Sequence, residues 1–260
     1  MSHRPATSPA EVRPRADRAP RADTSRGTHQ AVLQLILERG PCRVLDAPCG
    51  PGALAWELAR RGCQVWCLDC QPDVLAIEGV DFQVGDLQRR LDYEDGAFDA
   101  AACVDGIEHV ENPFHTVREF ARVLRPGGRL VLSTPNISAM RSRTRFFLTG
   151  FHNKFKRPLD ETRPSPRHHI SPITFPWLRY ILHTSGLRIA RVRANRIKAA
   201  SYPHLLFYPL AAAVTALCFL REKHPAQRRR HWEVYRALFS PAVFLGETLV
   251  VAAEKTRTGS

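Results

Sequence analysis

The amino-acid sequence predicts an α/β fold built on a mostly parallel, doubly wound sheet, and three observations lead to this prediction. Short apolar runs bounded by glycine or proline alternate with segments of helical periodicity between residues 29 and 136. A glycine-rich turn follows the first of these runs, at residues 46–52. After an irregular stretch, a helix and two further strands return in the rest of the 260-residue chain. This length is enough for one large domain.

The elements expected before residue 137 follow from apolar runs and their stop signals. The first helix ends at Gly40, the second at Gly62, and the last at the Pro126–Gly128 turn. Helices are therefore expected at 29–40, 53–62, 73–79 and 113–128. Strands are expected at 42–47, 63–69, 80–86, within 96–106, and at 129–136.

The alternation breaks over residues 137–176, which mix arginine, histidine, proline and aromatic residues without a clean period. We interpret this segment as a lid inserted over the edge of the sheet. Order returns at 174–194, where the pattern predicts a helix, a turn at Gly186 and a strand. The run at 247–255 predicts a last strand. Residues 28–260 are thus expected to form one domain.

One apolar stretch, at residues 205–220, is 16 residues long, whereas a membrane-spanning helix needs roughly 20. It contains Pro209, and the basic segment "REKHPAQRRRHW" follows it. The pattern favours a buried or docking helix within an apolar and basic insertion at 203–232. The alternatives are shallow insertion into a membrane surface through 205–230 and, least favoured, a true span.

Residues 1–27 are rich in proline, arginine, alanine and aspartate and have no apolar leader segment, so we expect them to be disordered. The seven cysteines, an odd number, together with the lack of a signal peptide indicate a reducing, cytoplasmic setting, with membrane association as an open option. Cys67 and Cys70 form a lone C-x-x-C with no second pair, which favours a structural role over zinc binding.

The formal net charge of +13 is concentrated in one part of the chain. Residues 28–140 carry 10 basic and 16 acidic side chains, whereas residues 141–198 carry 14 basic and 2 acidic ones. A positive field of this density attracts nucleic acid, anionic lipid or an acidic small molecule. The alternative is a solvated basic surface without a partner.

The sequence "DAPCGPG" after the first strand has the features of a nucleotide-binding loop. Gly50 and Gly52 lack a Cβ, so the backbone can turn tightly and a ligand can approach it. Asp46 and Asp69 each end a predicted strand, and Asp69 is suitably placed to accept hydrogen bonds from two ribose hydroxyls. Because "GPGALA" also fits G-x-G-x-x-A, this loop alone does not distinguish a dinucleotide from another nucleoside cofactor.

Three further motifs in order favour one family. They are "VGDL" at Asp86, "FDAAACVDGIEHV" at the fourth strand, and "RVLRPGGRLVLSTPN" leading into the fifth. Over residues 28–136 the chain resembles class I S-adenosylmethionine-dependent methyltransferases of the small-molecule type, including the ubiquinone-type O-methyltransferases. The resemblance implies a Rossmann-like sheet of seven strands with the last one antiparallel. It also implies S-adenosyl-L-methionine as the cofactor.

The resemblance also assigns roles to individual positions. The end of the second strand, Asp69, is expected to bind ribose, and Asp46 lies on the same rim. One position departs from the family pattern, because Pro48 replaces the usual first glycine of the loop and so removes a backbone donor. The remaining expected contacts are Ala47, Cys49, Gly50 and Gly52 with the methionine part, Asp86 and Leu87 with adenine, and Val104 and Asp105 with the methyl donor.

On the acceptor side, "DGIEHVENP" places Asp105, Glu108 and His109 at spacings that share one face of a helical turn. Two carboxylates and an imidazole suit a divalent cation of the Mg, Mn or Zn type, with His168 or His169 as a further ligand. Similar E-x-x-E-H patterns hold a metal in ubiquinone-type O-methyltransferases and in small-RNA 3′-end methyltransferases, although aspartate replaces the first glutamate here. Without a metal, these residues shape the loop, and one of the three histidines is a candidate general base.

The preferred function is methyl transfer from S-adenosylmethionine to an oxygen, with a carbon or nitrogen less favoured, of a small or lipid-like acceptor that can be anionic. An RNA end is the alternative within the same chemistry, since nucleic acid remains an open partner. Two alternatives of other classes are an NAD-dependent oxidoreductase and a non-catalytic protein of the membrane surface. Neither of these requires the full order of motifs.

Overall fold

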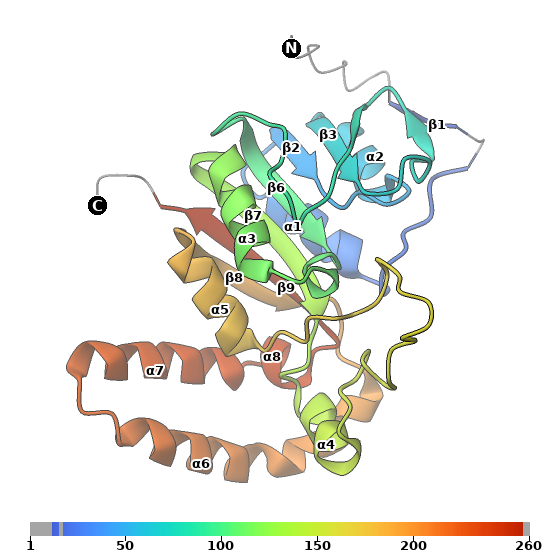
Figure 1. Ribbon diagram of the computed structural model, residues 1–260. Coiled ribbons are helices and arrows are strands. Elements are labelled where there is room, and N and C mark those ends of the chain that lie inside the picture. Colours follow the sequence, from blue (N-terminus) through green and yellow to red (C-terminus); the bar gives the residue numbers. More distant parts are fainter. Residues whose placement is uncertain (1–11, 16–17, 257–260) are drawn as a thin grey trace.

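The computed structural model describes residues 12–15 and 18–256, and its centre is a single seven-stranded sheet (Figure 1). The strand order across the sheet is β5-β3-β2-β6-β7-β9-β8. These strands are β2 (Arg43–Asp46), β3 (Gln64–Asp69), β5 (Asp81–Val84), β6 (Phe98–Val104), β7 (Leu124–Pro135), β8 (Leu187–Ala194) and β9 (Thr248–Lys255). The first five run parallel, and β9 is antiparallel to both of its neighbours. The predicted α/β fold, with seven strands and an antiparallel last strand, is confirmed.

Helices cover both faces of this sheet, as a doubly wound sheet requires. One face carries α1 (Thr28–Leu37) and α2 (Ala53–Ala59), and the other carries α3 (Pro113–Val123) and α5 (Phe175–Thr184). The alternation along β6 separates the two apolar cores, because Ala100 and Ala102 pack with α1 and α2 while Ala101 and Cys103 face the other way. The strands therefore read as continuous apolar runs in the sequence.

Helix 73–79 was predicted wrongly. Its residues form a turn and then the short strand β4 (Ile77–Glu78), which pairs antiparallel with β1 (Arg13–Pro14). The Arg13 Nε atom lies 2.6 Å from a carboxylate oxygen of Glu78. A partner more than 60 residues away in the chain thus decides the conformation of this segment.

The tail expected to be disordered, residues 1–27, lies partly outside the described residues. Of its described part, β1 pairs with β4, and Asn195 holds the segment near its end through a side-chain hydrogen bond to the carbonyl of Arg26. Asp23 and Thr24 line the cavity described below. The described part of the tail therefore contacts the domain.

The segment 137–176 contains one helix that its sequence pattern does not reveal, α4 (Met140–Thr149), which ends at Gly150 with φ of 72°. The rest is irregular until α5. Its last part runs beside the short 3-10 helix η2 (Ile107–His109), where the backbone amides of Ile170 and Ser171 both donate to the carbonyl of Glu108. This segment therefore brings basic and imidazole side chains to the carboxyl ends of the strands.

The insertion expected at 203–232 forms a helical hairpin between β8 and β9. Its elements are η3 (Ala199–Phe207), α6 (Tyr208–Leu220), α7 (Pro225–Leu238) and α8 (Pro241–Leu245). The apolar stretch was expected to be a buried or docking helix. A buried helix is wrong, because no residue of α6 is buried, and a docking helix stays a prediction. Among the described residues, the continuous helical segment Ala199–Leu220 is long and apolar enough to cross a membrane by length and composition. Within this segment only Ser201 of η3 is buried in the domain, and no residue of α6 is.

Candidate active site

A cavity of about 390 Å³ opens where the carboxyl ends of β2, β3 and β6 meet. Parallel strands bring their carboxyl ends to one edge, which is where ligands bind in sheets of this type. Of the ten residues predicted to bind cofactor, Ala47 and Gly52 do not line the cavity. The other eight line the cavity: Asp46, Cys49, Gly50, Asp69, Asp86, Leu87, Val104 and Asp105.

The glycine-rich loop forms an open cradle at Gly50. This residue has φ of 52°, and a Cβ built on it would meet no atom within 4 Å, so the space beside it is available to a ligand. Gly52 has a different task, because its φ of 83° starts α2 and a Cβ there would lie 2.8 Å from Ile77. Pro48, the departure from the family pattern, lines the cavity and packs against Gly106.

Asp69 is held rigidly at the end of β3. Its two carboxylate oxygens accept hydrogen bonds from the backbone amides of Gly50 and Gln71, both at 3.0 Å. The residue is buried yet lines the cavity. Since each carboxylate oxygen can accept a second hydrogen bond, Asp69 is arranged to receive two ligand hydroxyls.

Asp46 is buried beside the same cradle with its Oδ2 atom lacking a hydrogen-bond partner among the described residues. Burial raises the pKa of Asp46 to about 8, and the charge of nearby Asp69 acts in the same direction. An unpartnered polar atom at the cavity wall is a group that a polar ligand can satisfy.

The loop after β5 supplies the other end of the cavity. Asp86 is half-buried, and one of its oxygens accepts from the amide of Gln88 at 2.9 Å. Leu87 is buried and lines the wall next to it. A carboxylate beside an apolar side chain is suited to an adenine amino group and ring.

A sharp bend separates Asp105 from the residues that follow it. Its φ of 47° places it outside η2, and its carboxylate accepts a hydrogen bond from the Ser133 hydroxyl at 2.5 Å. The expected single helical turn carrying Asp105, Glu108 and His109 is therefore interrupted. Asp105 stays at the cavity wall, apart from the cluster that the next residues form.

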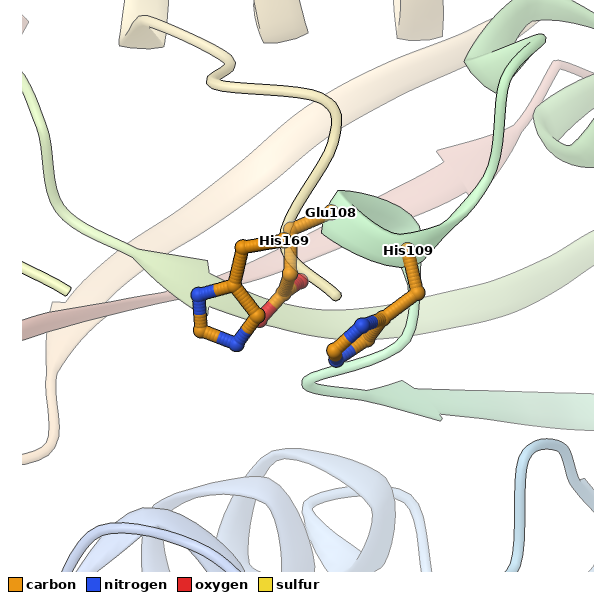
Figure 2. Close-up of side chains that lie close together, drawn as sticks. All are labelled: Glu108, His109 and His169. Atoms are coloured by element: carbon orange, nitrogen blue, oxygen red, sulfur yellow. The ribbon is translucent and has the colours of Figure 1, made fainter. Parts of the chain in front are cut away.

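Glu108, His109 and His169 converge from two segments (Figure 2). One potential ligand atom from each lies within 4.8 Å of the others. Glu108 is fully buried, and neither of its carboxylate oxygens has a well-formed hydrogen bond among the described residues. Burial, and then Asp105, raises the pKa of Glu108 well above its ordinary value. This donor set suits a divalent cation.

His109 presents a defined nitrogen to the cavity. Its Nδ1 atom lies 3.0 Å from the carbonyl oxygen of His168 and donates to it, so Nε2 is the unprotonated nitrogen of the neutral ring. Burial lowers the pKa of His109, and burial with the charge of His109 lowers the pKa of His169 to about 4. The two rings meet edge to face at 4.7 Å. Of the two candidates His168 and His169, the side chain of His169 lines the cavity, whereas His168 contributes its carbonyl.

A second space of about 680 Å³ adjoins the first at Asp105, His109 and His169. It is also lined by Lys154 and by residues 21–25, none of which the sequence analysis singled out. The Lys154 Nζ atom lies 3.1 Å from the Ser25 hydroxyl oxygen and 3.9 Å from a carboxylate oxygen of Glu247. No pattern in the sequence marks these residues, because they meet only through the fold.

Several other residues on the cofactor side were not predicted, and most of them come shortly after the end of a strand in the sequence. Cys70 and Gln71 come after β3 and line the cavity, and Gln88 follows β5. Arg167 reaches across from the irregular segment and donates to the Gln71 side chain at 3.3 Å. The strand ends were a usable signal for the first three residues but gave none for Arg167.

The chain is similar to known methyltransferases in both sequence and fold. Residues 45–132 match the family model described as a methyltransferase domain. The chain is 37% identical over 109 residues to the ubiquinone biosynthesis O-methyltransferase of Xanthomonas oryzae pv. oryzae, covering 38% of this chain and 46% of that protein. The protein of the same name from Xanthomonas campestris pv. campestris is 37% identical over 103 residues, covering 36% and 43%. The chain thus spans just under half the length of these curated relatives.

Solved structures share the fold over a longer stretch. An S-adenosylmethionine-dependent methyltransferase from Archaeoglobus fulgidus has a TM-score of 0.53 at 18% identity, covering 88% of this chain and 95% of that one. A second, from Mesorhizobium loti, has a TM-score of 0.51 at 20% identity, covering 87% and 96%. At these identities the likeness concerns the fold, and it extends well beyond the part matched in sequence.

Proposed function

We propose that this chain, which carries a class I S-adenosylmethionine-dependent methyltransferase domain, transfers the methyl group of S-adenosylmethionine to an oxygen of a small or lipid-like acceptor. One observation carries the proposal. The open cradle at Gly50, the fixed carboxylate of Asp69 and the Asp86–Leu87 pair line one cavity in the order that this cofactor needs. The relatives named for ubiquinone biosynthesis support oxygen as the acceptor atom.

The residues present fit the cofactor. Asp69 would accept hydrogen bonds from the ribose hydroxyls, and Asp86 from the adenine amino group. The cradle beside Gly50 would receive the methionine part, with Asp46 next to it. Bound there, S-adenosylmethionine would supply a methyl group on a positively charged sulfur; the acceptor oxygen would bond to the methyl carbon, and the sulfur would leave as the thioether of S-adenosylhomocysteine.

The acceptor side needs alignment and removal of one proton. The acceptor hydroxyl would enter through the space lined by Lys154 and His169, and its proton would pass to His109 Nε2. The carbonyl of His168 holds the imidazole in the tautomer that can accept this proton. Lys154 would favour an acceptor that carries negative charge.

In an alternative arrangement, Glu108, His109 and His169 would hold a divalent cation of the Mg, Mn or Zn type, and His109 would not act as the base. The buried, unpartnered carboxylate of Glu108 is the observation that favours this. A cation there would lower the pKa of a coordinated acceptor hydroxyl. The two arrangements differ in one measurable respect, because transfer assisted by a cation stops when a chelator is added.

The test is transfer of labelled methyl groups into fractionated cell extract, with and without chelator, together with thermal stabilisation by S-adenosylhomocysteine. Asp69→Ala should lose at least about tenfold in affinity for S-adenosylhomocysteine and should abolish labelling. His109→Gln should keep that stabilisation while transfer falls about 10²- to 10⁴-fold. Full labelling by Asp69→Ala would show that the cofactor site is misassigned.

The same assay separates the alternatives. An RNA acceptor predicts labelled nucleic acid and binding that weakens steeply with salt. A nicotinamide oxidoreductase predicts stabilisation by NADH and none by S-adenosylhomocysteine. A non-catalytic protein predicts no label in any fraction.

A further inference from the structure

We propose that one end of the molecule, formed by η3, α6 and the end of α4, is a docking surface for anionic lipid membranes, with α6 lying in the plane of the bilayer surface. The proposal goes beyond methyl transfer and does not depend on it. It rests on three features of the described residues: an apolar helix with one open side, a second exposed apolar group on the neighbouring helix, and basic side chains most of which lack an acidic partner.

The helix α6 is apolar on all sides but packs on only one. Its inner side meets α7, where the Phe219 and His231 ring centroids are 4.7 Å apart, and the residue after α7, where those of Tyr208 and Phe239 are 5.4 Å apart. The outer side is open. Leu206, near the end of η3, is 83% exposed, and Leu210, Val214 and Leu217 of α6 follow it at helical spacing and are 68%, 51% and 62% exposed.

A second apolar group lies beside this stripe. The last turn of α4 carries Phe146, Phe147 and Leu148, of which Phe147 is 87% exposed. Helix α4 packs against η3, so the two groups belong to the same end of the molecule (Figure 1). Soluble monomers rarely expose a contiguous apolar patch of this kind, and a patch with a polar rim marks a docking surface.

Basic residues flank the apolar surface. Arg221 and Lys223 lie in the turn after α6, and exposed Arg228, Arg229 and Arg230 follow in the first half of α7. Among the described residues, only Arg229 of these five has an acidic partner, Glu233 at 3.9 Å. Apolar side chains with arginine and lysine beside them suit an interface between acyl chains and anionic headgroups.

This chemistry favours lipid over other occupants. Nucleic acid would use the basic residues but would leave the leucine stripe exposed to water. A second copy of the chain would cover the leucines but would bring two sets of unpaired cations together. An anionic membrane satisfies both features at once.

The topology argues that α6 lies on the membrane rather than across it. The chain leaves the domain at η3 and returns to it at α8, so both ends of the hairpin are on one side. Crossing by α6 would force α7 to cross back, yet α7 carries Arg228, Arg229 and Arg230 and is only 14 residues long. The apolar α6 would therefore enter the headgroup region with α7 on its aqueous side.

The experiment is flotation of the full chain with phosphatidylcholine vesicles, with and without phosphatidylglycerol, at low and high salt. We expect the protein to float with phosphatidylglycerol-containing vesicles and to be released by high salt. Leu210→Gln/Leu217→Gln should weaken partitioning at least about tenfold, because two apolar side chains lose their burial in lipid. Arg228→Gln/Arg229→Gln/Arg230→Gln should weaken binding to phosphatidylglycerol vesicles by a similar factor or more.

The matched control is Val84→Gln, which replaces an apolar residue that is 60% exposed at the opposite edge of the sheet. It should float like the unaltered protein. A second measurement avoids altering the apolar stripe: a polarity-sensitive dye on exposed Cys218 of α6, in a Cys70→Ser background, should shift to the blue with phosphatidylglycerol vesicles.

Four results would overturn the proposal. The first is that the unaltered protein does not float, and the second is that the leucine variant floats as well as the control. The third is that the protein stays on vesicles at high salt, as a spanning helix would. The fourth is that the protein is a dimer in solution, that the leucine substitutions make it monomeric, and that no vesicle binding is seen. None of these measurements contains cofactor or acceptor, so their failure would leave the proposed methyl transfer untouched.

Discussion

Among single residues at the site, Asp46 couples its protonation to the stability of the fold. Asp46 is only 1% exposed, and one of its carboxylate oxygens has no hydrogen-bond partner among the described residues. Because burial disfavours the charged form, the pKa rises from 3.8 to about 8 in the folded protein. The folded state therefore holds a proton that the unfolded chain releases.

This difference predicts that stability falls as the pH rises from about 4 to about 8, since the folded state binds the extra proton throughout that window. Asp46→Asn removes the titrating group, so the variant should be more stable than the unaltered protein at pH 8 by at least about 1 kcal/mol. Its free energy of unfolding should also change less between pH 5 and pH 8. Urea denaturation at both pH values, without cofactor, measures this.

Asp99→Asn is the control for Asp46→Asn. The pKa of Asp99 is lowered by the amide of Arg43 and the side chain of Arg125, which together outweigh its desolvation, so it titrates below this window. It should leave the pH slope between 5 and 8 unchanged. An unaltered slope in Asp46→Asn as well would mean that Asp46 is ionised in the folded protein.

Site residues at the ends of strands could be predicted from the sequence. Site residues that irregular segments bring to the cavity could not. Asp69 and Asp86 were predictable because each directly follows an apolar run. Lys154 and Thr24 line the acceptor space, yet they lie in segments without periodicity and more than 120 residues apart. His169 was one of two candidates, and the fold separates their roles: His169 lines the cavity, whereas the His168 carbonyl accepts a hydrogen bond from His109.

Among the elements, the turn into α2 depends on a glycine for two separate reasons. Gly52 has a left-handed φ of 83°, and its missing Cβ leaves room for Ile77 and Leu75. Gly40 has nearly the same φ of 84°, but a Cβ there would meet nothing within 4 Å. A substitution at Gly40 would therefore test backbone strain alone, whereas the same substitution at Gly52 would test backbone strain together with side-chain crowding.

We expect Gly40→Ala to destabilise the protein by about 1 kcal/mol, which is the cost of a left-handed alanine. Gly52→Ala should cost about 1 to 3 kcal/mol more, because the side chains of Ile77 and Leu75 must move. Urea unfolding of the two variants measures the difference. Equal destabilisation would show that the side chains near Gly52 move without cost and that crowding plays no part at this turn.

Elements with their own periodicity were predictable, and those that depend on a distant partner were not. The pattern at 174–194 gave α5, the turn at Gly186 and β8. The segment 73–79 resembles a helix locally, yet it pairs with β1, which no local pattern can show. The apolar run of α6 is indistinguishable in sequence from a buried helix, because burial depends on what packs against it.

In the molecule as a whole, Arg129 on β7 joins three distant parts of the chain. Its guanidinium lies 2.8 Å from Glu38 after α1 and 3.0 Å from Glu254 on β9, and it donates to the carbonyl of Leu35 at 2.6 Å. The arginine side chain is only 8% exposed. Removing it leaves two partly buried carboxylates with fewer partners.

Arg129→Met should therefore lower the free energy of unfolding by about 2 to 3 kcal/mol. Arg125→Met is the matched control on the same strand. Its guanidinium pairs with Asp99 at 2.5 Å but is 51% exposed, so this change should cost less than about 1 kcal/mol. Chemical denaturation compares them, and equal costs would mean that burial adds nothing to the Arg129 contacts.

The root of the α6–α7 hairpin bears on how this fold can diversify. The chain leaves and re-enters the sheet at adjacent points, where Ile197 bridges Gly246 and the amide of Glu247 donates to the carbonyl of Arg196. Asn136 ties the returning α8 to the end of β7 through hydrogen bonds to the carbonyls of Val243 and Gly246. Because both ends of the hairpin are tied at one place, a change in its length would not require any strand of the sheet to shift.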